Sequence, residues 1–449
     1  MKKLPAKELP MKEPLNQEAP MQNQTATDPT RKAPTTPITA PRSDAAVTAP
    51  LPTYDVAIVG GGIVGATLAC SLRDSGLRVA IIEAQPRERA LQRPRAYALS
   101  LLSSRIFAGL GAWEALRSQV APFRQIRLSD ADYPGIVQFL PTDLDTEDLG
   151  YVGEHGVICR HLYDAIDTSE NVTWYCPATL ATVTHDENIV LLRIQQDGQE
   201  QVLRSRLVVG ADGPNSPLRR RAEIPTSGWK YWQSCVTFTI HHQHPSNETA
   251  FERFWYGGPM GVLPLPGNRC QIVWTAPHAE AQDLQALSET EFLGRLNERL
   301  GGLLPEIELV SDRFLFPVQL MQSDRYSQNR LVLVGDAAHC CHPVGGQGLN
   351  LGIRDAAALA EVLQQAHQQG EDIGSTPVLR RYERWRKPEN WLILGFTDLL
   401  DRLFSSRWLP LIALRRLGLW GLANLAPLKT VALRLMTGLL GRRPNLAQS

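Results

Sequence analysis

The amino-acid sequence predicts an α/β fold in which a parallel, Rossmann-like sheet is assembled from discontinuous segments. It also predicts an inserted, mostly antiparallel β-sheet domain and a C-terminal helical extension. The parallel sheet follows from three short apolar runs, residues 56–59, 207–209 and 331–334, that each end in glycine. The antiparallel sheet follows from residues 231–276, where aromatic and β-branched runs are split by Pro and Gly.

The first apolar run leads into the most informative motif of the chain. Gly60, Gly62 and Gly65 have G-x-G-x-x-G spacing, and Glu83 closes the next apolar run, 23 residues after Gly60. In a strand–turn–helix unit these glycines permit a tight turn, close approach to a pyrophosphate, and close packing of helix on strand. The diphosphate would lie at the positive end of the helix, and Glu83 would bind a ribose hydroxyl. A dinucleotide site is therefore predicted; the alternative is a glycine-rich turn without function.

The other elements follow from hydrophobic periodicity and from Gly and Pro. The predicted helices are residues 63–75, a segment that begins near residue 103, residues 156–170 and residues 349–369. The predicted strands are residues 78–83, several strands and turns within 122–150, and strands along 172–209, with a hairpin turn at Asp197-Gly198.

Composition limits the classes of function. Lys+Arg and Asp+Glu are both 46, so the chain is formally neutral and no electrostatic argument for nucleic-acid binding exists. The seven cysteines are scattered without a C-x-x-C pair, which indicates free thiols in a reducing compartment. Residues 339–342 read His-Cys-Cys-His, but adjacent ligands rarely close a tetrahedral site, so no metal is expected.

Residues 1–50 are predicted to be a disordered, Pro-rich tail. They contain nine prolines, no aromatic residue and charges of both signs, and such a segment buries too little apolar surface to offset the entropy of ordering. They also lack the apolar core of a secretory signal. A cytoplasmic location is therefore expected.

Three motifs in order carry a family resemblance: the G-x-G-x-x-G, then Gly210-Ala211-Asp212-Gly213, then Gly335-Asp336-Ala337-Ala338-His339. Arg95 to Ser100 resembles an Arg-x-x-Ala-Leu-Ser box, and His339 to Asp355 resembles a flavin loop. Together they resemble the FAD-dependent aromatic hydroxylases of the para-hydroxybenzoate hydroxylase fold, and within that fold the ubiquinone-biosynthesis hydroxylase family. The resemblance runs from about Tyr54 to Gly441.

The resemblance implies the residues that would hold FAD. Asp336 would bind the ribityl chain or ribose, although it also suits a helix N-cap. Arg95 would contact the diphosphate, with a solvated surface position as the alternative. The flavin loop would place backbone N–H groups against the ring, close to the positive end of a helix starting near Asn350. The loop residues concerned are Pro343, Gly345, Gly346, Gly348 and Asn350.

Asp212 and Gly213 would, by the same resemblance, lie near both FAD and NAD(P)H, which is expected to bind transiently as the reductant. Residues 219–221, three arginines, would attract its phosphates or else form a solvated helix face. Arg160 resembles a family position that approaches FAD, and the ordinary alternative is an arginine near a helix start.

The reaction implied by the resemblance is hydroxylation of an aromatic ring. NAD(P)H would reduce FAD, O2 would form a flavin C4a-hydroperoxide, and that species would hydroxylate an electron-rich ring, expected to be a prenylated phenol of quinone biosynthesis. Phe254, Tyr256, Leu263 and Pro264 are the candidate walls of the substrate pocket; a plain sheet core is the alternative. The sequence identifies no catalytic base.

The motifs also suggest domain boundaries. The FAD-binding domain is expected at residues 51–121, 151–228 and 317–390, and the substrate domain at residues 122–150 and 229–316. Residues 391–449 would form the C-terminal helical extension.

The C-terminal extension combines apolar runs with basic residues. From residue 396 onward there are eight Lys and Arg and only two acidic residues, and no apolar run reaches the ~18 residues that a membrane-spanning helix needs. Basic residues among Leu and Trp suit a helix lying on anionic lipid, so peripheral contact with the cytoplasmic membrane face is one expectation. A helix pair packed on the FAD-binding domain is the other.

Two other functions remain open from the sequence. A prenyl-chain reductase shares the glycine motif and also acts on membrane lipids, but needs no O2. A non-catalytic FAD-binding subunit of a multi-enzyme complex would bind FAD without oxidising NAD(P)H. The intact loop from Pro343 to Asn350 argues against the second.

Overall fold

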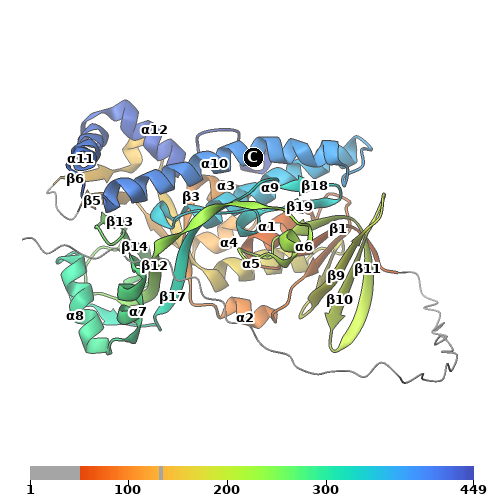
Figure 1. Cartoon of the computed structure of the whole chain (residues 1–449), viewed down its shortest axis with the longest axis horizontal. Coiled ribbons are helices and arrows are strands. Elements are labelled where there is room, and N and C mark those ends of the chain that lie inside the picture. Colours follow the sequence, from red (N-terminus) through yellow and green to blue (C-terminus); the bar gives the residue numbers. More distant parts are fainter. Residues whose placement is uncertain (1–50, 131–134, 449) are drawn as a thin grey trace, which may run out of the picture. The chain divides into compact units, whose positions relative to one another are not determined.

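The computed structural model describes residues 51–130 and 135–448, so the predicted N-terminal tail lies outside the described residues. Three β-sheets and the helices that cover them make up this part of the chain (Figure 1). The α/β class is confirmed.

The eight-stranded sheet contains the predicted parallel core. Its order is β18-β19-β11-β1-β2-β8, and β1 pairs in parallel with β11 and β2, as β11 does with β19. The three apolar runs far apart in sequence therefore lie side by side, as predicted. The strands are β1 (Thr53–Val59), β2 (Val79–Ile82), β8 (Val172–Tyr175), β9 (Thr179–His185), β10 (Val190–Gln196), β11 (Gln199–Gly210), β18 (Ser327–Gln328) and β19 (Leu331–Leu333).

The predicted hairpin joins β10 to β11. Gln196 pairs with Gln199, and Asp197 and Gly198 between them have φ of 52° and 76°. Two successive positive φ angles are typical of the two-residue turn whose twist matches that of the strands, and Asp-Gly adopts it at low cost.

Helices cover this sheet, and the four predicted ones are present with ends that differ by one to three residues. The helix predicted at residues 156–170 is α5, which spans His155–Asp167, and the one predicted from near residue 103 begins at Leu101. α1 ends at Leu72, where Ser75 N–H bonds to the Leu72 carbonyl and Gly76 adopts a φ of 81°. α9 begins at Gln347, two residues early, because Gly346 at its N-cap is left-handed. The helices around this sheet are α1 (Ile63–Leu72), α2 (Arg87–Leu91), α3 (Leu101–Gly109), α4 (Trp113–Arg117), α5 (His155–Asp167), α6 (Pro217–Arg221) and α9 (Gln347–Gln368).

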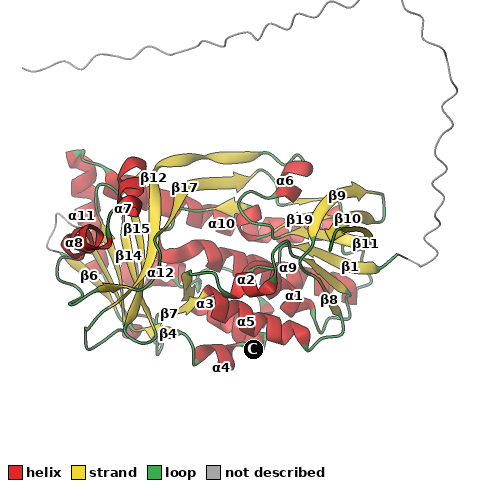
Figure 2. Cartoon of the chain, turned by 90° about the horizontal axis from the view of Figure 1, so that it is seen from below, coloured by secondary structure: helices red, strands yellow, loops and turns green. Residues whose placement is uncertain are grey.

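The nine-stranded sheet is antiparallel except where β13 pairs in parallel with β5. It unites residues 125–139 with residues 226–323, and α7 (His278–Ala286) and α8 (Glu289–Leu300) pack against it. Figure 2 shows β12 and β17 extending from it toward α6. Its strands are β5 (Gln125–Asp130), β6 (Ile136–Phe139), β12 (Thr226–His241), β13 (Thr249–Phe254), β14 (Met260–Leu265), β15 (Arg269–Pro277), β16 (Glu308–Leu309), β17 (Phe314–Ser323) and β20 (His339–Cys340).

A three-stranded sheet lies against the nine-stranded one, where β4 and β7 contact β14. It has the order β3-β7-β4, formed by β3 (Ala96–Ser100), β7 (Gly150–Glu154) and β4 (Ala121–Phe123). The predicted domain boundaries at residues 228/229 and 316/317 fall inside β12 and β17. The division into domains therefore stays a prediction, since these two strands are continuous across it.

The predicted C-terminal helices are confirmed as α10 (Thr376–Ser405), α11 (Leu409–Asn424) and α12 (Ala426–Met436). The predicted start of the extension at residue 391 falls inside α10, so this boundary stays a prediction. α10 packs on α9, and α11 packs on β6 of the nine-stranded sheet (Figure 1). Within residues 51–130 and 135–448, no helix has the length and apolarity required to cross a membrane.

Candidate functional site

The turn between β1 and α1 depends on close backbone contacts at two glycines. Gly60 has a φ of 108°, and a β-carbon there would lie 2.3 Å from the Ala211 carbonyl oxygen. A β-carbon at Gly65 would lie 1.9 Å from the Gly60 oxygen. The first and third glycines of the motif are therefore required sterically by β11 and α1 packing against the turn.

Gly62 differs from these two glycines because it faces open space. It is the N-cap of α1, and a β-carbon there would have no atom within 4 Å. No side chain caps this helix and no acidic residue lies in its first turn. Free N–H groups at a helix N-terminus that is neither capped nor covered form an anion site. This is the cradle in which a diphosphate fits.

Glu83 lies beside this turn, just after β2. Its carboxylate accepts the Gly61 N–H at 2.6 Å and the Gln85 N–H at 2.8 Å. Two acceptor oxygens have about four lone-pair sites, so these bonds fix the carboxylate and leave room for ribose hydroxyl donors.

Asp212 and Gly213 follow β11 at the same edge of the sheet. Asp212 accepts the Leu218 N–H at 3.0 Å through Oδ2, while Oδ1 is buried with no hydrogen-bond partner. Desolvation raises the pKa of this carboxyl. A buried acceptor without a donor is costly, and a ligand hydroxyl would satisfy it. Gly213 has a φ of 82°, and a β-carbon there would have no atom within 4 Å.

Asp336 and Arg95 lie at the third strand–glycine junction. Asp336 is exposed, and the Gly335 before it has a φ of 59°. The Arg95 guanidinium lies 4.6 Å from the centre of the Phe316 ring. Desolvation raises the pKa of Tyr97, and both Arg95 and Asp336 act electrostatically on this phenol. The two charged residues therefore face a common site.

The glycine loop before α9 is held by Asn350. Its Oδ1 accepts the Ser100 N–H and the Ser103 hydroxyl, and its Nδ2 donates to the carbonyls of Ala98 and Gly346. The side chain of Asn350 thus connects the loop to the Arg-x-x-Ala-Leu-Ser box rather than pointing to a ligand. Its functional contribution is to fix the loop.

The loop itself contains two successive left-handed glycines. Gly345 and Gly346 have φ angles of 67° and 61°, and α9 starts directly after them at Gln347. Pro343 precedes them, and Gly348 lies in the first turn of α9 near the Cys341 sulfur. The start of this long helix provides a positive end beside the loop.

Four other residues of the sequence motifs have different surroundings. Arg160 is exposed on α5. Arg219 is buried and donates to the carbonyls of Ala337 and Pro214, so it holds the backbone in place. His339 contacts Asp355 at 2.6 Å, and His342 contacts Gln233 at 3.3 Å. The described residues contain no cluster of three His, Cys, Asp or Glu side chains placed to hold a metal ion.

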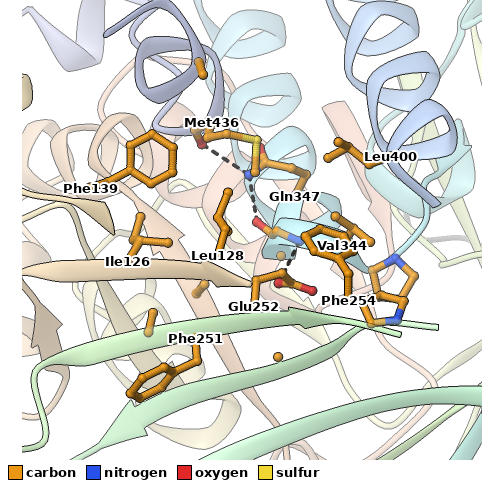
Figure 3. A pocket seen from close by; sticks show the side chains of 18 of the residues that line it. Ile126, Leu128, Phe139, Phe251, Glu252, Phe254, Val344, Gln347, Leu400 and Met436 are labelled. Carbon is orange, nitrogen blue, oxygen red and sulfur yellow. Dashed lines mark hydrogen bonds between the residues drawn. The ribbon is translucent and has the colours of Figure 1, made fainter. Parts of the chain in front are cut away.

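An apolar cavity of about 250 Å³ lies next to the glycine loop (Figure 3). Strands β5, β6, β13 and β14 form one wall, and α10, α11 and α12 form another. Its apolar lining includes Ile126, Leu128, Phe139, Phe251, Phe254, Leu263, Val344, Leu400, Phe404, Leu419, Leu433 and Met436.

Two of the four predicted pocket residues do not line this cavity. Phe254 and Leu263 do line it, but Pro264, the next residue on β14, points to the opposite face because side chains alternate along a strand. Tyr256 comes after β13 has ended at Phe254, and its ring lies 4.5 Å from the Arg407 guanidinium. The sequence prediction resolved neither the end of β13 at Phe254 nor the alternation of side chains along β14.

Glu252 lines the cavity and was missed by the sequence analysis. It lies on β13 between Phe251 and Arg253 and accepts the Gly345 N–H at 3.4 Å. Desolvation raises the pKa of Glu252 to about 7. The sequence signal that could have identified Glu252 was a single carboxylate in a strand that also contains Phe251 and Phe254.

These residues fit FAD: an open helix N-terminus, a buried unpartnered carboxylate oxygen and a left-handed glycine loop converge on one edge of the parallel sheet. Ligands of such sheets bind outside the carboxyl ends of the strands. Each predicted cofactor residue except Arg160 belongs to this edge or to the loop beside it, and their individual contacts with FAD remain proposals.

Comparison with known proteins identifies the family. Residues 53–397 match the family described as FAD binding domain. An uncharacterised protein of Synechocystis, slr1300, is 59% identical over 88% of this chain and 95% of its own length. The ubiquinone hydroxylase UbiL of Rhodospirillum rubrum is 36% identical over 87% of this chain and 91% of its own.

A solved structure has the same fold. The p-nitrophenol 4-monooxygenase PnpA of Pseudomonas putida superposes with a TM-score of 0.75 at 20% identity, covering 88% of this chain and all of PnpA. At this identity the likeness concerns the fold alone. With the family match and the 36% identical relative, it follows that the chain belongs to the FAD-dependent aromatic hydroxylases, in the family of the ubiquinone-biosynthesis hydroxylases.

Proposed function

We propose that this protein uses FAD, NAD(P)H and O2 to hydroxylate the ring of a prenylated phenol in quinone biosynthesis. The observation that carries the substrate class is the cavity, which combines a long apolar lining with one acidic side chain beside the Gly345–Gly346 loop. An apolar pocket with a few polar groups that fix orientation is the usual design of a small-molecule site. The name of the relative UbiL supports ubiquinone as the end product.

Bound FAD would supply electron transfer from NAD(P)H and activation of O2. The chain's own residues do the rest. Gly62 and the first turn of α1 hold the diphosphate, Glu83 and Asp336 bind hydroxyl groups, and Arg95 adds positive charge. Gly345 and Gly346 allow the backbone to approach the flavin ring, and Asn350 holds them in that position.

The cavity lining would exclude water from the reacting ring. Phe139, Phe254 and Phe404 contribute aromatic surface, and the rings of Phe254 and Phe404 stack with centroids 3.8 Å apart. The C-terminal helices α10 to α12 close the side opposite the sheet. A dry pocket prevents wasteful loss of the oxidising equivalent as peroxide.

We also propose peripheral attachment to the cytoplasmic membrane face through the C-terminal helices, because those helices are apolar on their outer surface too. Leu409 is 77% exposed, Trp408 65% and Leu417 62%. Arg402 and Arg407 lie near these side chains in sequence, and basic residues favour anionic lipid. The same helices line the cavity, so attachment would place the cavity close to the membrane, which suits a lipid-soluble substrate. The free cysteines support a reducing, cytoplasmic location; assembly into a multi-enzyme complex stays a prediction.

The decisive experiment measures NAD(P)H oxidation and product formation by the purified, flavin-loaded protein with ortho-geranylphenol, in air and without O2. A hydroxylase forms a ring-hydroxylated product and consumes O2. A prenyl-chain reductase would oxidise NAD(P)H equally without O2 and saturate the chain. A non-catalytic subunit would bind FAD and oxidise no NAD(P)H with any phenol. Absence of bound flavin would reject all three.

A further inference from the structure

The cavity next to the glycine loop has one polar end. Apart from Glu252 and Gln347, its polar side chains are already engaged. Arg415 pairs with Asp130 at 2.7 Å, and Asn350 uses both of its amide atoms. Thr275 bonds to Cys235, and Thr437 bonds to the Leu433 carbonyl. The polar end is therefore defined by Glu252 and Gln347.

Both of these side chains are anchored at Gly345. The Gly345 N–H donates to Glu252 Oε2 at 3.4 Å, and Gln347 Nε2 donates to the Gly345 carbonyl at 2.8 Å (Figure 3). Gln347 Nε2 also donates to the Met436 carbonyl at 3.2 Å, which fixes the orientation of the amide. Its Oε1 is buried and has no hydrogen-bond partner.

This end of the cavity consequently offers acceptors. Glu252 has a carboxylate with one long hydrogen bond, and Gln347 has a free carbonyl oxygen, while the amide hydrogens of Gln347 are taken. A buried acceptor selects a ligand that carries a donor, because a ligand without one leaves it unpaired. A ring with an O–H group fits, and a ring with only ether or carbonyl oxygens does not.

We propose that Glu252 is a catalytic residue that accepts the hydrogen bond, and then the proton, of the ring hydroxyl of the substrate, with Gln347 Oε1 orienting the same ring. This inference rests on the proposed function. In the transfer the phenolic O–H bond breaks, a Glu252 O–H bond forms, and the electron pair stays on the ring oxygen. The negative charge moves from the carboxylate to the ring, which becomes a better nucleophile. The proton returns to the ring oxygen after hydroxylation.

The surroundings of Glu252 suit this role. On β5 and β14 its register partners are Leu128 and Gly261, which do not titrate. The charged group elsewhere on the cavity wall, Arg415, is neutralised by Asp130. The Cys235 thiol nearby stays neutral because burial raises its pKa to about 12. Desolvation, opposed by the hydrogen bond from the Gly345 N–H, brings the pKa of Glu252 to about 7, where a general base is effective at neutral pH.

The test compares Glu252→Gln, Glu252→Asp and the control Glu248→Gln, which removes an exposed carboxylate just before β13. Each flavin-loaded protein is titrated with ortho-geranylphenol and with its methyl ether, which has no O–H, without NAD(P)H. Wild type and the control should prefer the phenol by about tenfold or more above pH ~7, as expected for a hydrogen bond to a charged group. Glu252→Gln should lose most of this preference while keeping its flavin and its affinity for the ether.

Turnover provides the second readout. In wild type kcat/KM should rise with pH through about 7, as expected for ionisation of the base in the free enzyme, and Glu252→Asp should retain this limb at a lower rate. In Glu252→Gln, kcat/KM should no longer rise with pH and should be lower by a factor of about 10²–10⁴.

Each outcome separates the two proposals. An unchanged phenol preference and pH profile in Glu252→Gln would overturn the role of Glu252 while leaving the hydroxylase function intact. Wild type that distinguishes phenol from ether but forms no hydroxylated product would reject the hydroxylase function. In that case loss of the distinction in Glu252→Gln would still support Glu252 as the acceptor. Wild type that binds neither ligand would reject both.

Discussion

The carbonyl oxygen of Gly60 lies directly against Gly65, so that a β-carbon at Gly65 would be 1.9 Å from it. No side-chain movement relieves this contact, because both partners are backbone. Gly65 is therefore a packing requirement of the β1–α1 unit, whereas Gly62, three residues earlier in the same motif, touches nothing. Substitution of Gly65 should therefore lower the stability of the fold, whereas substitution of Gly62 should leave the stability intact.

Gly65→Ala should destabilise the protein by about 3 kcal/mol or more, since the added methyl group forces α1 away from the turn. Urea unfolding followed by circular dichroism measures the effect. Gly294→Ala is the control: Gly294 lies inside α8 with no atom near the added methyl group, and a gain of about 0.5–1 kcal/mol is expected. Equal stability of Gly65→Ala and wild type would show that the turn is looser than described.

Gly62→Asp should remove bound flavin without unfolding the protein. Asp is a favoured N-cap residue, but Gly is nearly as good, so the stability of the flavin-free protein should hold or rise by about a few tenths of a kcal/mol. The carboxylate would, however, repel a diphosphate at the same helix end. Flavin absorbance per polypeptide measures the loss. Gly62→Asn has nearly the same size without charge and should retain more flavin; equal loss in both would mean that size, not charge, decides.

Asn350→Ala should destabilise the loop that precedes α9. Four hydrogen bonds disappear and buried backbone groups at Ala98, Ser100 and Gly346 lose a partner, with an expected cost of about 3 kcal/mol. Thermal unfolding and flavin affinity both report it. Asn424→Ala removes an exposed Asn at the end of α11 and should change stability by less than about 0.5 kcal/mol. Similar values for the two variants would contradict a bridging role for Asn350.

His342 should make the protein sensitive to acid. Burial lowers its pKa to about 3, whereas the unfolded chain takes up this proton near pH 6.5. Between these values the unfolded state binds more protons, so stability is full above pH ~6.5 and falls with decreasing pH, by up to about 1.4 kcal/mol per pH unit. Urea unfolding at pH 7 and pH 5 measures the slope.

His342→Gln cannot titrate and should show a smaller decrease between these pH values. Asp401, 3.4 Å from His342, has a pKa raised by burial and titrates in the opposite sense, but it is present in both proteins. The difference between the two slopes therefore isolates His342. Identical slopes would show that the histidine is protonated in the folded state.

Leu409→Asp combined with Leu417→Asp should weaken binding to vesicles of phosphatidylcholine and phosphatidylglycerol by about tenfold or more, since each exposed Leu contributes ~1.5 kcal/mol or more on burial. Sedimentation with vesicles measures it. Val310→Asp introduces the same charge at an exposed apolar position outside the C-terminal helices and should bind like wild type. Unchanged binding of the double variant would assign the exposed apolar face to another partner.

The amino-acid sequence predicted the parallel sheet and the edge where the cofactor residues converge. Strand–glycine–acid junctions carry this information locally, because a tight turn, a left-handed backbone and an uncapped helix each require particular residues at fixed spacing. The Asp197-Gly198 hairpin was predictable for the same reason. The side-chain environment of Asn350 was not, since its partners at Ala98, Ser100 and Ser103 are about 250 residues away.

The substrate cavity was decided by tertiary structure. Its walls come from β5 and β6, from β13 and β14, and from helices after residue 376, and no local pattern says that these segments meet. Strand alternation turned Pro264 away, and the end of β13 removed Tyr256. Tertiary structure also decides the environment of Glu252. The sequence shows a carboxylate between Phe251 and Arg253, but only the packing of Leu128 and Gly261 around it removes water and raises its pKa toward neutrality.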